Sequence, residues 1–224
     1  MDYLTGIEKA FTGVTTTLEI TVFAVLLGLI LGLIVALMKM SKLKVLRAIG
    51  SVYVEILRGT PLLVQALIWY NGVPALIQGF GIDFTWRGTG VLVGIIACGI
   101  NSSAYVAEII RAGLQAVDIG QTEAARSLGL SQRKTMRFVI IPQAIRIILP
   151  AMGNEFITLI KETAVLSVIA IEEITRKCVL WASMGYKFWE AYIGVAVVYL
   201  CLTIPLSRIV AYAERRMAVS DRRS

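Results

Sequence analysis

Two carboxylates lie seven residues apart in an apolar stretch of the sequence, where ionisable side chains are rare. Glu155 and Glu162 both fall between residues 146 and 169. Seven residues make about two helical turns, so a helix would place both carboxylates on one face, about 10 Å apart along its axis. Lys161 would project about 100° away from Glu162, so it cannot neutralise both. Two carboxylates in a low-dielectric environment attract a cation and repel an anion.

Other polar side chains are expected at the depth of Glu155. A helix would place Glu155 about 13 Å from Arg146, near the middle of a membrane if the helix spans one. Ionisable groups at that depth usually face the bundle interior or a water-filled cavity. We therefore expect Glu155 and Glu162 to bind a small cationic molecule. The alternative is that Glu155 bonds an Asn or Ser of a neighbouring helix and never contacts a ligand. The other candidate residues of this site are Gln65, Asn101, Ser102, Ser103 and Thr163.

A polar and basic insert from Glu123 to Pro142 separates two apolar segments. The stretch Gln121 to Leu128 contains good helix formers and no proline, and Gly129 permits the positive φ that ends a helix. Ser131 can cap a second helix. This pattern predicts a compact helical hairpin, and an ordinary loop that happens to be helical is the alternative. The apolar residues expected on one face of the first helix are Ala124, Ala125 and Leu128.

The composition is typical of a membrane protein. The chain has 224 residues, 57% of them hydrophobic, and a mean hydropathy of +0.77, which is too apolar for a soluble globular domain. Histidine is absent, so histidine catalysis and histidine metal sites are excluded. We expect no catalytic residue, no metal site and no cofactor bound to this chain. The isolated cysteines, which we interpret as packing residues, are Cys98, Cys178 and Cys201.

Five apolar stretches are each about 20 residues or slightly longer, the length that crosses a hydrocarbon core. They predict an all-α fold, a polytopic membrane helical bundle that forms one domain over residues 1–224. A helix break is expected in the second stretch, where Gly59 and Pro61 precede Gln65. A loop of residues 112–145 would contain the hairpin. The predicted spans are residues 17–38, 53–77, 90–111, 146–169 and 189–210.

The distribution of Lys and Arg predicts the orientation of these spans. With the N-terminus outside, the inner segments hold 15 of the 22 basic residues and the outer segments hold 5, which is a strong positive-inside bias. The net charge of +7 is then explained by cytoplasmic loops and anionic membrane lipid, and no nucleic-acid partner is expected. The outer residues are Lys9, Arg87, Arg176, Lys177 and Lys187, and the inner ones include Arg222 and Arg223.

Two charged pairs at i, i+3 spacing have an expected structural role. Glu55 can pair with Arg58, and Glu108 can pair with Arg111, on one helix in each case. The predicted outer loop of residues 171–187 mixes both signs of charge. It could contact an extracellular partner or lie flat on the membrane, and the sequence leaves both open.

The hairpin segment resembles the EAA motif of permease subunits in binding-protein-dependent ABC importers of type I. The motif residues are Glu123-Ala124-Ala125, Gly129 and Val139-Ile140-Ile141-Pro142. Val139 and Ile141 depart conservatively from the Ile and Leu that are usual there. Further stretches resemble the polar amino-acid branch of that family over nearly the whole chain. They are Gly120 to Ser131, Pro142 to Arg146, Arg58 to Gln65, Ala104 to Arg111, Asn154 to Ile157 and Ile160 to Thr163.

This resemblance implies a transport subunit of the bacterial inner membrane, not an enzyme. It implies a separate ABC ATPase, an extracellular substrate-binding protein, and a second copy or a related permease as partners. The chain lacks a G-x-x-x-x-G-K-[ST] segment, so ATP and Mg²⁺ would bind to the ATPase. The residues implied to couple to the ATPase are Glu123, Ala124, Ala125, Arg126 and Gly129.

The resemblance also implies inward transport of a polar amino acid by alternating access. The two carboxylates favour a basic one, such as arginine, lysine or histidine, and a neutral or other polar amino acid is the alternative. Glu162 stands where this branch often carries Asp or Asn, which bears on substrate choice. A more distant alternative is a passive channel whose cytoplasmic hairpin binds an unrelated partner. A membrane enzyme is third, because the sequence offers no metal-ligand cluster and no nucleophile–base pair.

Overall fold

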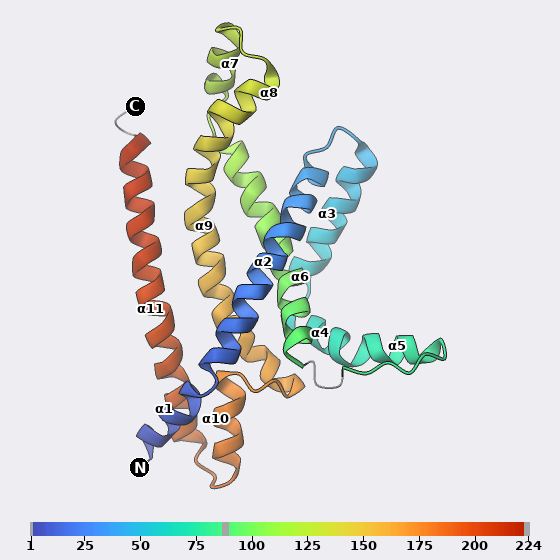
Figure 1. Ribbon diagram of the computed structural model, residues 1–224, viewed down its shortest axis with the longest axis vertical. Helices are drawn as coiled ribbons and strands as arrows, with labels where there is room; N and C mark the ends of the chain where they lie inside the picture. The colour runs from blue at the N-terminus through green and yellow to red at the C-terminus, as the bar shows by residue number, and fades with distance from the viewer. Residues whose placement is uncertain (1, 87–89, 222–224) are drawn as a thin grey trace.

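The computed structural model describes residues 2–86 and 90–221 and is an all-α bundle over that part of the chain (Figure 1), which confirms the predicted fold class. The helices are α1 (Tyr3–Phe11), α2 (Val14–Lys39), α3 (Lys44–Gly59), α4 (Leu62–Leu67), α5 (Val73–Gly79), α6 (Gly90–Gln115), α7 (Ile119–Ser127), α8 (Gln132–Thr135), α9 (Ile141–Glu162), α10 (Ile174–Ser183) and α11 (Phe188–Asp221).

Four helical stretches within the described residues are long and apolar enough to cross a membrane, or five if one bent pair counts as a span. They correspond to the predicted spans, with longer ends. Helix α2 is preceded by α1, so the first stretch runs from Tyr3 to Lys39. The large apolar side chains on the outer faces of α2, α9 and α11 are exposed, as expected where lipid is the solvent.

The helix break predicted near Gly59 and Pro61 is present in the second span, which is not a single straight helix. The stretch Lys44–Gly59 and the stretch Leu62–Gly79 meet at a bend of 101°. Thr60 and Pro61 at the bend have extended backbone, and Pro61 cannot donate a helical hydrogen bond. A π-helical turn (Ile68–Gly72) follows between α4 and α5. Helices α4 and α5 therefore project sideways from the bundle (Figure 1).

Helices α2 and α6 form the central contact of the bundle. The contact is close because small residues face each other. A Cβ added at Gly32 of α2 would lie 2.7 Å from the Cβ of Val106, and one added at Gly99 of α6 would lie 2.7 Å from Leu27. The core around this contact includes Ile20, Ala97 and Leu159.

Helices α1 and α10 were not predicted from hydropathy, because each is too short to span a membrane. They pack with the start of α11 around a second apolar cluster. Gly6 and Gly194 allow this, since a Cβ at Gly194 would lie 2.5 Å from the backbone carbon of Gly6. The predicted outer loop of residues 171–187 is thus largely a packed helix.

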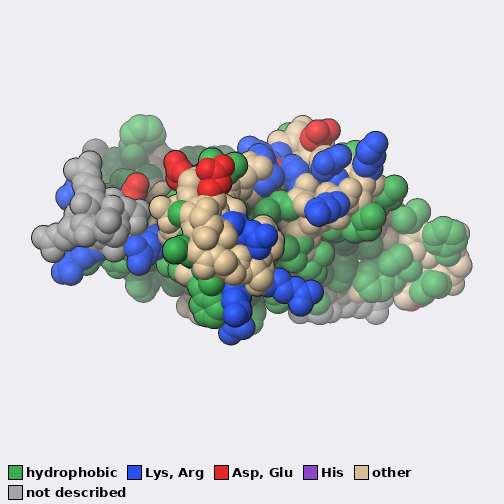
Figure 2. Space-filling model, turned by 90° about the horizontal axis from the view of Figure 1, so that it is seen from above, with side chains coloured by type: hydrophobic (Ala, Val, Ile, Leu, Met, Phe, Trp, Pro, Cys, Tyr) green, Lys and Arg blue, Asp and Glu red, His purple; other side chains and the backbone are tan. Residues whose placement is uncertain are grey.

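The links between helices divide into two groups at opposite ends of the bundle. The α7–α8 hairpin, the α2–α3 link and the end of α11 lie together at one end, which we call the hairpin end, and the N-terminus and α10 lie at the other (Figure 1). Figure 2 views the molecule from the hairpin end and shows many Lys and Arg side chains there. Of the basic residues counted above, Arg87, Arg222 and Arg223 lie outside the described part of the chain.

Candidate functional site

Glu155 lies on α9 opposite the middle of α6. The Ser102 hydroxyl donates to Glu155 Oε1 at 2.6 Å, and Ser102 is fully buried. Helix α2 packs closely against α6 at this point, since a Cβ added at Gly28 would lie 3.2 Å from the Ser102 Oγ. Within the described residues, Glu155 Oε2 accepts no hydrogen bond. The carboxylate therefore has one anchored and one available oxygen.

Glu162 lies at the end of α9, two turns from Glu155. It is half-buried, and it forms no hydrogen bond or ion pair with any residue in the described ranges. Lys161 is exposed, as expected from its position about 100° around the helix. A 3₁₀ turn (Thr163–Ile169) continues from α9. At its start the buried Thr163 hydroxyl donates to the Ile160 carbonyl at 2.7 Å, a bond within its own helix.

Gln65 and Asn101 meet at the break between α3 and α4. Gln65 Nε2 donates to the Leu57 carbonyl at 2.8 Å and to Thr60 Oγ1 at 2.9 Å. Asn101 Nδ2 donates to Gln65 Oε1 at 3.1 Å. The last carbonyls of a helix have no helical donor, so these two amides stabilise the broken end of α3. Both side chains are buried. Gln65 uses both its Nε2 and its Oε1, and Asn101 uses its Nδ2.

Ser103 belongs to a third arrangement, on the side of α6 that faces α3. Its hydroxyl lies 2.7 Å from the Tyr53 hydroxyl and 2.6 Å from the Ile100 carbonyl. The predicted site residues are therefore brought to the same region of α6 but not into one cluster. Glu155 pairs with Ser102, Gln65 pairs with Asn101, and Ser103 pairs with Tyr53, a residue that the sequence did not single out.

The hairpin forms at the predicted residues. The Asp118 side chain caps α7 by accepting from the Gly120 backbone nitrogen at 2.6 Å, and Ser131 is the N-cap of α8. Gly129 between them has φ +83°, a left-handed conformation that favours glycine. Arg126 Nη1 donates to the Leu130 carbonyl at 2.9 Å and closes the turn from outside.

The predicted loop of residues 112–145 implied that the hairpin ends before the next span begins. In the structure, the second helix of the hairpin is instead continuous with that span. Helix α8 passes through a π-helical turn (Met136–Ile140) directly into α9, so that one helical stretch runs from Gln132 to Ile169. Pro142 lies in the first turn of α9 and Pro150 inside it, and neither ends the helix. The hairpin is thus rigidly joined to the helix that carries Glu155.

The tip of the hairpin presents apolar side chains to solvent. Leu128 is 84% exposed and Phe138 is 65% exposed. Glu123 and Ala124 are also exposed, whereas Ala125 is buried. Ala124 and Leu128 therefore lie on an outer face of α7. The prediction that Ala125 shares this face is wrong, because Ala125 turns toward the inside of the hairpin. Exposed apolar groups rimmed by charge are typical of a protein interaction site.

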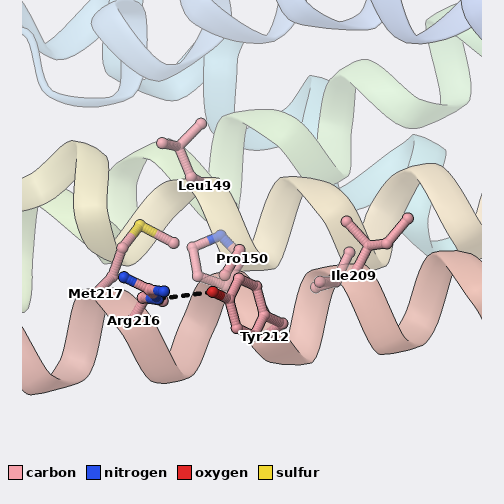
Figure 3. A pocket seen from close by; sticks show the side chains of 8 residues that line it. Leu149, Pro150, Ile209, Tyr212, Arg216 and Met217 are labelled. Atoms are coloured by element: carbon pink, nitrogen blue, oxygen red, sulfur yellow. Dashed lines mark hydrogen bonds between the residues drawn. The ribbon is translucent and has the colours of Figure 1, made fainter.

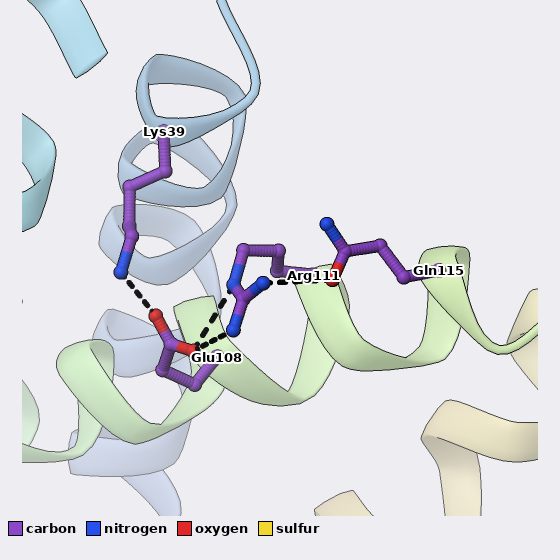
Figure 4. Close-up of polar contacts among 4 residues, drawn as sticks. All are labelled: Lys39, Glu108, Arg111 and Gln115. Atoms are coloured by element: carbon purple, nitrogen blue, oxygen red, sulfur yellow. Dashed lines mark hydrogen bonds and ion pairs between the residues drawn. The ribbon is translucent and has the colours of Figure 1, made fainter.

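An ionic cluster joins α2 to α6 near the hairpin end (Figure 4). Glu108 accepts from Lys39 through one oxygen and from Arg111 through the other, and Arg111 also donates to Gln115 at 2.7 Å. The predicted Glu108–Arg111 pair is confirmed, with Lys39 as a partner that the sequence did not suggest. The predicted pairing of Glu55 with Arg58 is not formed within the described residues, where the Arg58 guanidinium lies 5.2 Å from the centre of the Tyr105 ring.

A fully buried carboxylate, Glu173, organises the segment at the opposite end. It caps α10 by accepting from the backbone nitrogens of Thr175 and Arg176 at 2.8 Å each, and it also accepts from the Tyr199 hydroxyl at 3.0 Å. Burial raises the pKa of Glu173, although the hydrogen bonds from these groups oppose the shift. Glu173 connects α10 to α11 and so fixes the predicted outer loop.

A helical bundle with a broken second span and a basic hairpin between the third and fourth spans is a distinctive combination. The family model of the binding-protein-dependent transport system inner membrane component matches residues 28–219. The chain belongs to this family. The match begins within α2 and ends in the last turn of α11, and it includes both the hairpin and the segment around Glu155.

Curated members of the family resemble the chain over almost its full length. The arginine transport system permease protein ArtQ of Bacillus subtilis is 39% identical over 209 residues, which cover 93% of this chain and 92% of ArtQ. The probable glutamine ABC transporter permease protein GlnM of the same organism is 40% identical over 204 residues, which cover 91% of each chain.

Solved structures have the same fold. A chain from a crystal structure of an amino acid ABC transporter with histidines has 46% sequence identity and a TM-score of 0.87, over 96% of this chain and 99% of that one. The methionine ABC transporter MetNI in an inward-facing conformation contains a chain with 20% identity and a TM-score of 0.69, over 95% of each chain. The second likeness concerns the fold alone.

Proposed function

We propose that this chain is the membrane-spanning subunit of an ATP-driven importer that carries an amino acid into the cell. Membership of the family and the names of ArtQ and GlnM support this proposal. A separate ABC ATPase would bind the exposed tip of the hairpin, and a substrate-binding protein would deliver the amino acid to the opposite face. A second copy of the chain, or a related permease, would complete the translocation path.

The hairpin is suited to transmit movement from an ATPase to the substrate path. It continues without a break into α9, and the Gln143 side chain on α9 donates to Gln121 on α7 at 3.2 Å. A displacement of the hairpin would therefore move α9 and, with it, Glu155. This connection favours an importer over a passive channel, which needs no such link.

The substrate that we propose is a basic amino acid. The observation that carries this proposal is the available oxygen of Glu155 on α9, with a second carboxylate two turns away at Glu162. A cationic side chain would compensate both charges, and an acidic substrate would be repelled. The arginine permease ArtQ and the transporter structure with histidines are relatives whose names agree with a basic substrate.

A neutral polar amino acid is the second candidate. GlnM and several other relatives carry the name of glutamine permeases at 36–40% identity, which is as close as ArtQ. The Ser102–Glu155 hydrogen bond also supports a purely structural use of Glu155. In that case the α-amino group and the amide of the substrate would be held by other polar groups.

Substrate-stimulated ATP hydrolysis by the complete complex separates these candidates. The complex of the permease, its ATPase and its binding protein is reconstituted in liposomes, and arginine, lysine, histidine and glutamine are compared. We expect basic amino acids to stimulate hydrolysis and Glu155→Gln to reduce that stimulation about tenfold, as loss of a charge-assisted interaction of roughly 1.4 kcal/mol predicts. Glu55→Gln is the matched control, because Glu55 is an exposed carboxylate on α3.

Each result has a distinct meaning. Unchanged stimulation in Glu155→Gln would remove Glu155 from the substrate site. Stimulation by glutamine alone would replace the basic substrate with the neutral one. Hydrolysis that responds to no amino acid, in a complex that assembles normally, would contradict an amino-acid importer as such.

A further inference from the structure

An apolar groove lies between α9 and α11 near the hairpin end of the bundle (Figure 3). Its volume is about 540 Å³. The helices approach closely at Gly153, where an added Cβ would lie 2.6 Å from Val210 Cγ2. Beyond this point they separate beside Pro150, and the space between them is the groove. Its other lining residues are Leu149, Ile209, Tyr212, Ala213, Arg216 and Met217.

Arg216 is the cationic residue among the described side chains that line the groove. Arg216 Nε donates to the Tyr212 hydroxyl at 2.8 Å, and its guanidinium lies 5.2 Å from the centre of the Tyr212 ring. The two residues are one helical turn apart on α11, so the tyrosine holds the arginine over the groove. Figure 3 shows the Arg216 head group beside Tyr212 at one end of the apolar lining. Within the described residues, the other N–H groups of the guanidinium donate no hydrogen bond.

The position along α11 is where a helix leaves the hydrocarbon core. The part of α11 that is long and apolar enough to cross a membrane runs from Phe188 to Met217. Arg216 lies in the last turn of this stretch, from where a long cationic side chain can reach the head groups. Ile209 and Leu149 remain 63% and 54% exposed, so the groove opens to the surroundings of the bundle. An apolar channel that ends in a cation at this depth matches a phospholipid, with an acyl chain on one side and a phosphate on the other.

We propose that this groove binds an anionic phospholipid of the leaflet at the hairpin end, with its acyl chain against Pro150 and Ala213 and its phosphate on Arg216. The lipid would fill the space between α9 and α11 and so brace α9, the helix that joins the hairpin to Glu155. Charge favours this occupant, because Arg215 adds a second positive charge beside Arg216 and the two outweigh the neighbouring Glu214. Basic pockets between membrane helices attract anionic head groups.

Lipid retention by the purified complex tests the proposal. The complex is placed in nanodiscs that contain equal amounts of phosphatidylglycerol and phosphatidylcholine, extracted into mild detergent, and analysed by native mass spectrometry. We expect bound phosphatidylglycerol in the wild type and about fivefold less in Arg216→Gln, as predicted for one cation near a head group. Arg215→Gln is the matched control, since Arg215 is adjacent and exposed but does not line the groove.

A second variant distinguishes the contribution of the apolar groove to lipid binding from that of the Arg216 charge. Ala213→Phe fills the groove and keeps Arg216, and it should also lower phosphatidylglycerol retention if the acyl chain lies there. The proposal is overturned if Arg215→Gln and Arg216→Gln lose lipid equally, since the effect is then only surface charge. It is also overturned if Ala213→Phe retains lipid normally, or if a photoreactive group at Ile209 crosslinks to a second permease copy and not to lipid.

Discussion

Polar side chains on α6 are used in two ways, although they lie within three consecutive positions of one helix. Asn101 completes the broken end of α3 through Gln65, which is a structural use. Ser102 holds one oxygen of Glu155 on α9 and leaves the other available. This difference follows from direction, because successive residues of a helix project about 100° apart. Glu155 therefore has an oxygen available to a ligand, whereas Gln65 and Asn101 bond to each other and to α3.

The Glu108 cluster should contribute measurably to stability. Glu108→Gln would leave Lys39 and Arg111 close together without the carboxylate that both contact, at a cost of about 1–3 kcal/mol for partly buried groups. We expect the apparent Tm in detergent to fall by about 2–4 °C for each kcal/mol lost. Glu172→Gln is the control, because its ion pair with Lys177 is exposed, and it should change Tm little. Equal shifts in both variants would contradict the role of Glu108 as a clamp.

Glu173 should give the structure a characteristic dependence on pH. Burial raises the pKa of Glu173 above the ordinary value of 4.5, so the folded state binds this proton more tightly than the unfolded state does. Its contribution to stability is then complete below the unfolded pKa and is lost as pH rises through the folded pKa. As pH rises above 4.5, we expect Tm to fall more in the wild type than in Glu173→Gln. Identical pH profiles would show that Glu173 does not titrate in this range.

Among the elements, the hairpin carries the clearest prediction. Gly129→Pro should uncouple the permease from its ATPase, because proline fixes φ near −65°, whereas Gly129 has φ +83°. We expect substrate-stimulated ATP hydrolysis to fall roughly tenfold, as the loss of about 1–2 kcal/mol at the contact predicts. Glu123→Arg, which reverses the charge of an exposed hairpin residue, should act in the same direction.

A matched control for Gly129→Pro exists in the turn after α5, away from the hairpin (Figure 1). Gly81 has φ +81° and donates to the Gln78 carbonyl at 2.8 Å, as Gly129 donates to the Arg126 carbonyl at 3.0 Å. Gly81→Pro thus imposes the same local strain away from the hairpin. If both variants reduce stimulation equally, the effect is general instability and the hairpin is not the coupling element.

The long elements could be predicted from the sequence, because hydropathy over about 20 residues reports directly on membrane spans. The hairpin could be predicted because Gly129 and Ser131 have strong local preferences. The direction of the chain after Pro61 could not be predicted from the sequence, since a proline marks a helix break but does not set the angle at which the next helix begins. Helices α1 and α10 were missed because their stability comes from close packing at Gly6 and Gly194, which depends on residues far apart in sequence.

The candidate site was predictable only in part. The apolar residues around Glu155 were sufficient to identify it as a candidate, since a carboxylate inside a membrane span is energetically costly and is usually kept for a function. Which polar group it meets depends on the rotation of α9 against α6, and the sequence does not contain that rotation. The same limit explains why Gln65, Asn101 and Ser103 share a depth with Glu155 and yet bond to other groups.

Over the whole molecule, the two groups of links differ in charge as well as in position. Lys39, Arg126, Arg137 and Arg215 all lie at the hairpin end. Toward the N-terminus, the acidic residues Glu172, Glu173 and Glu190 offset the basic residues Arg176, Lys177 and Lys187. Such an asymmetry determines the orientation of a protein in the membrane, because basic links are retained on the cytoplasmic side during insertion. The charge distribution therefore supports an orientation in which the hairpin faces the cytoplasm, where an ATPase can reach it.

Labelling of single cysteines tests this orientation. Cys98 and Cys178 are buried, so replacing the exposed Cys201 with serine leaves a chain with little native reactivity toward a maleimide. A cysteine at Ser127 then reports on the hairpin, and one at Ser183 reports on the end of α10, where both native side chains are exposed. With a membrane-impermeant maleimide, we expect Ser183→Cys to react in intact cells and Ser127→Cys to react only in inverted vesicles. The reverse pattern would place the hairpin outside and remove it from contact with any cytoplasmic ATPase, so the proposed coupling depends on this result.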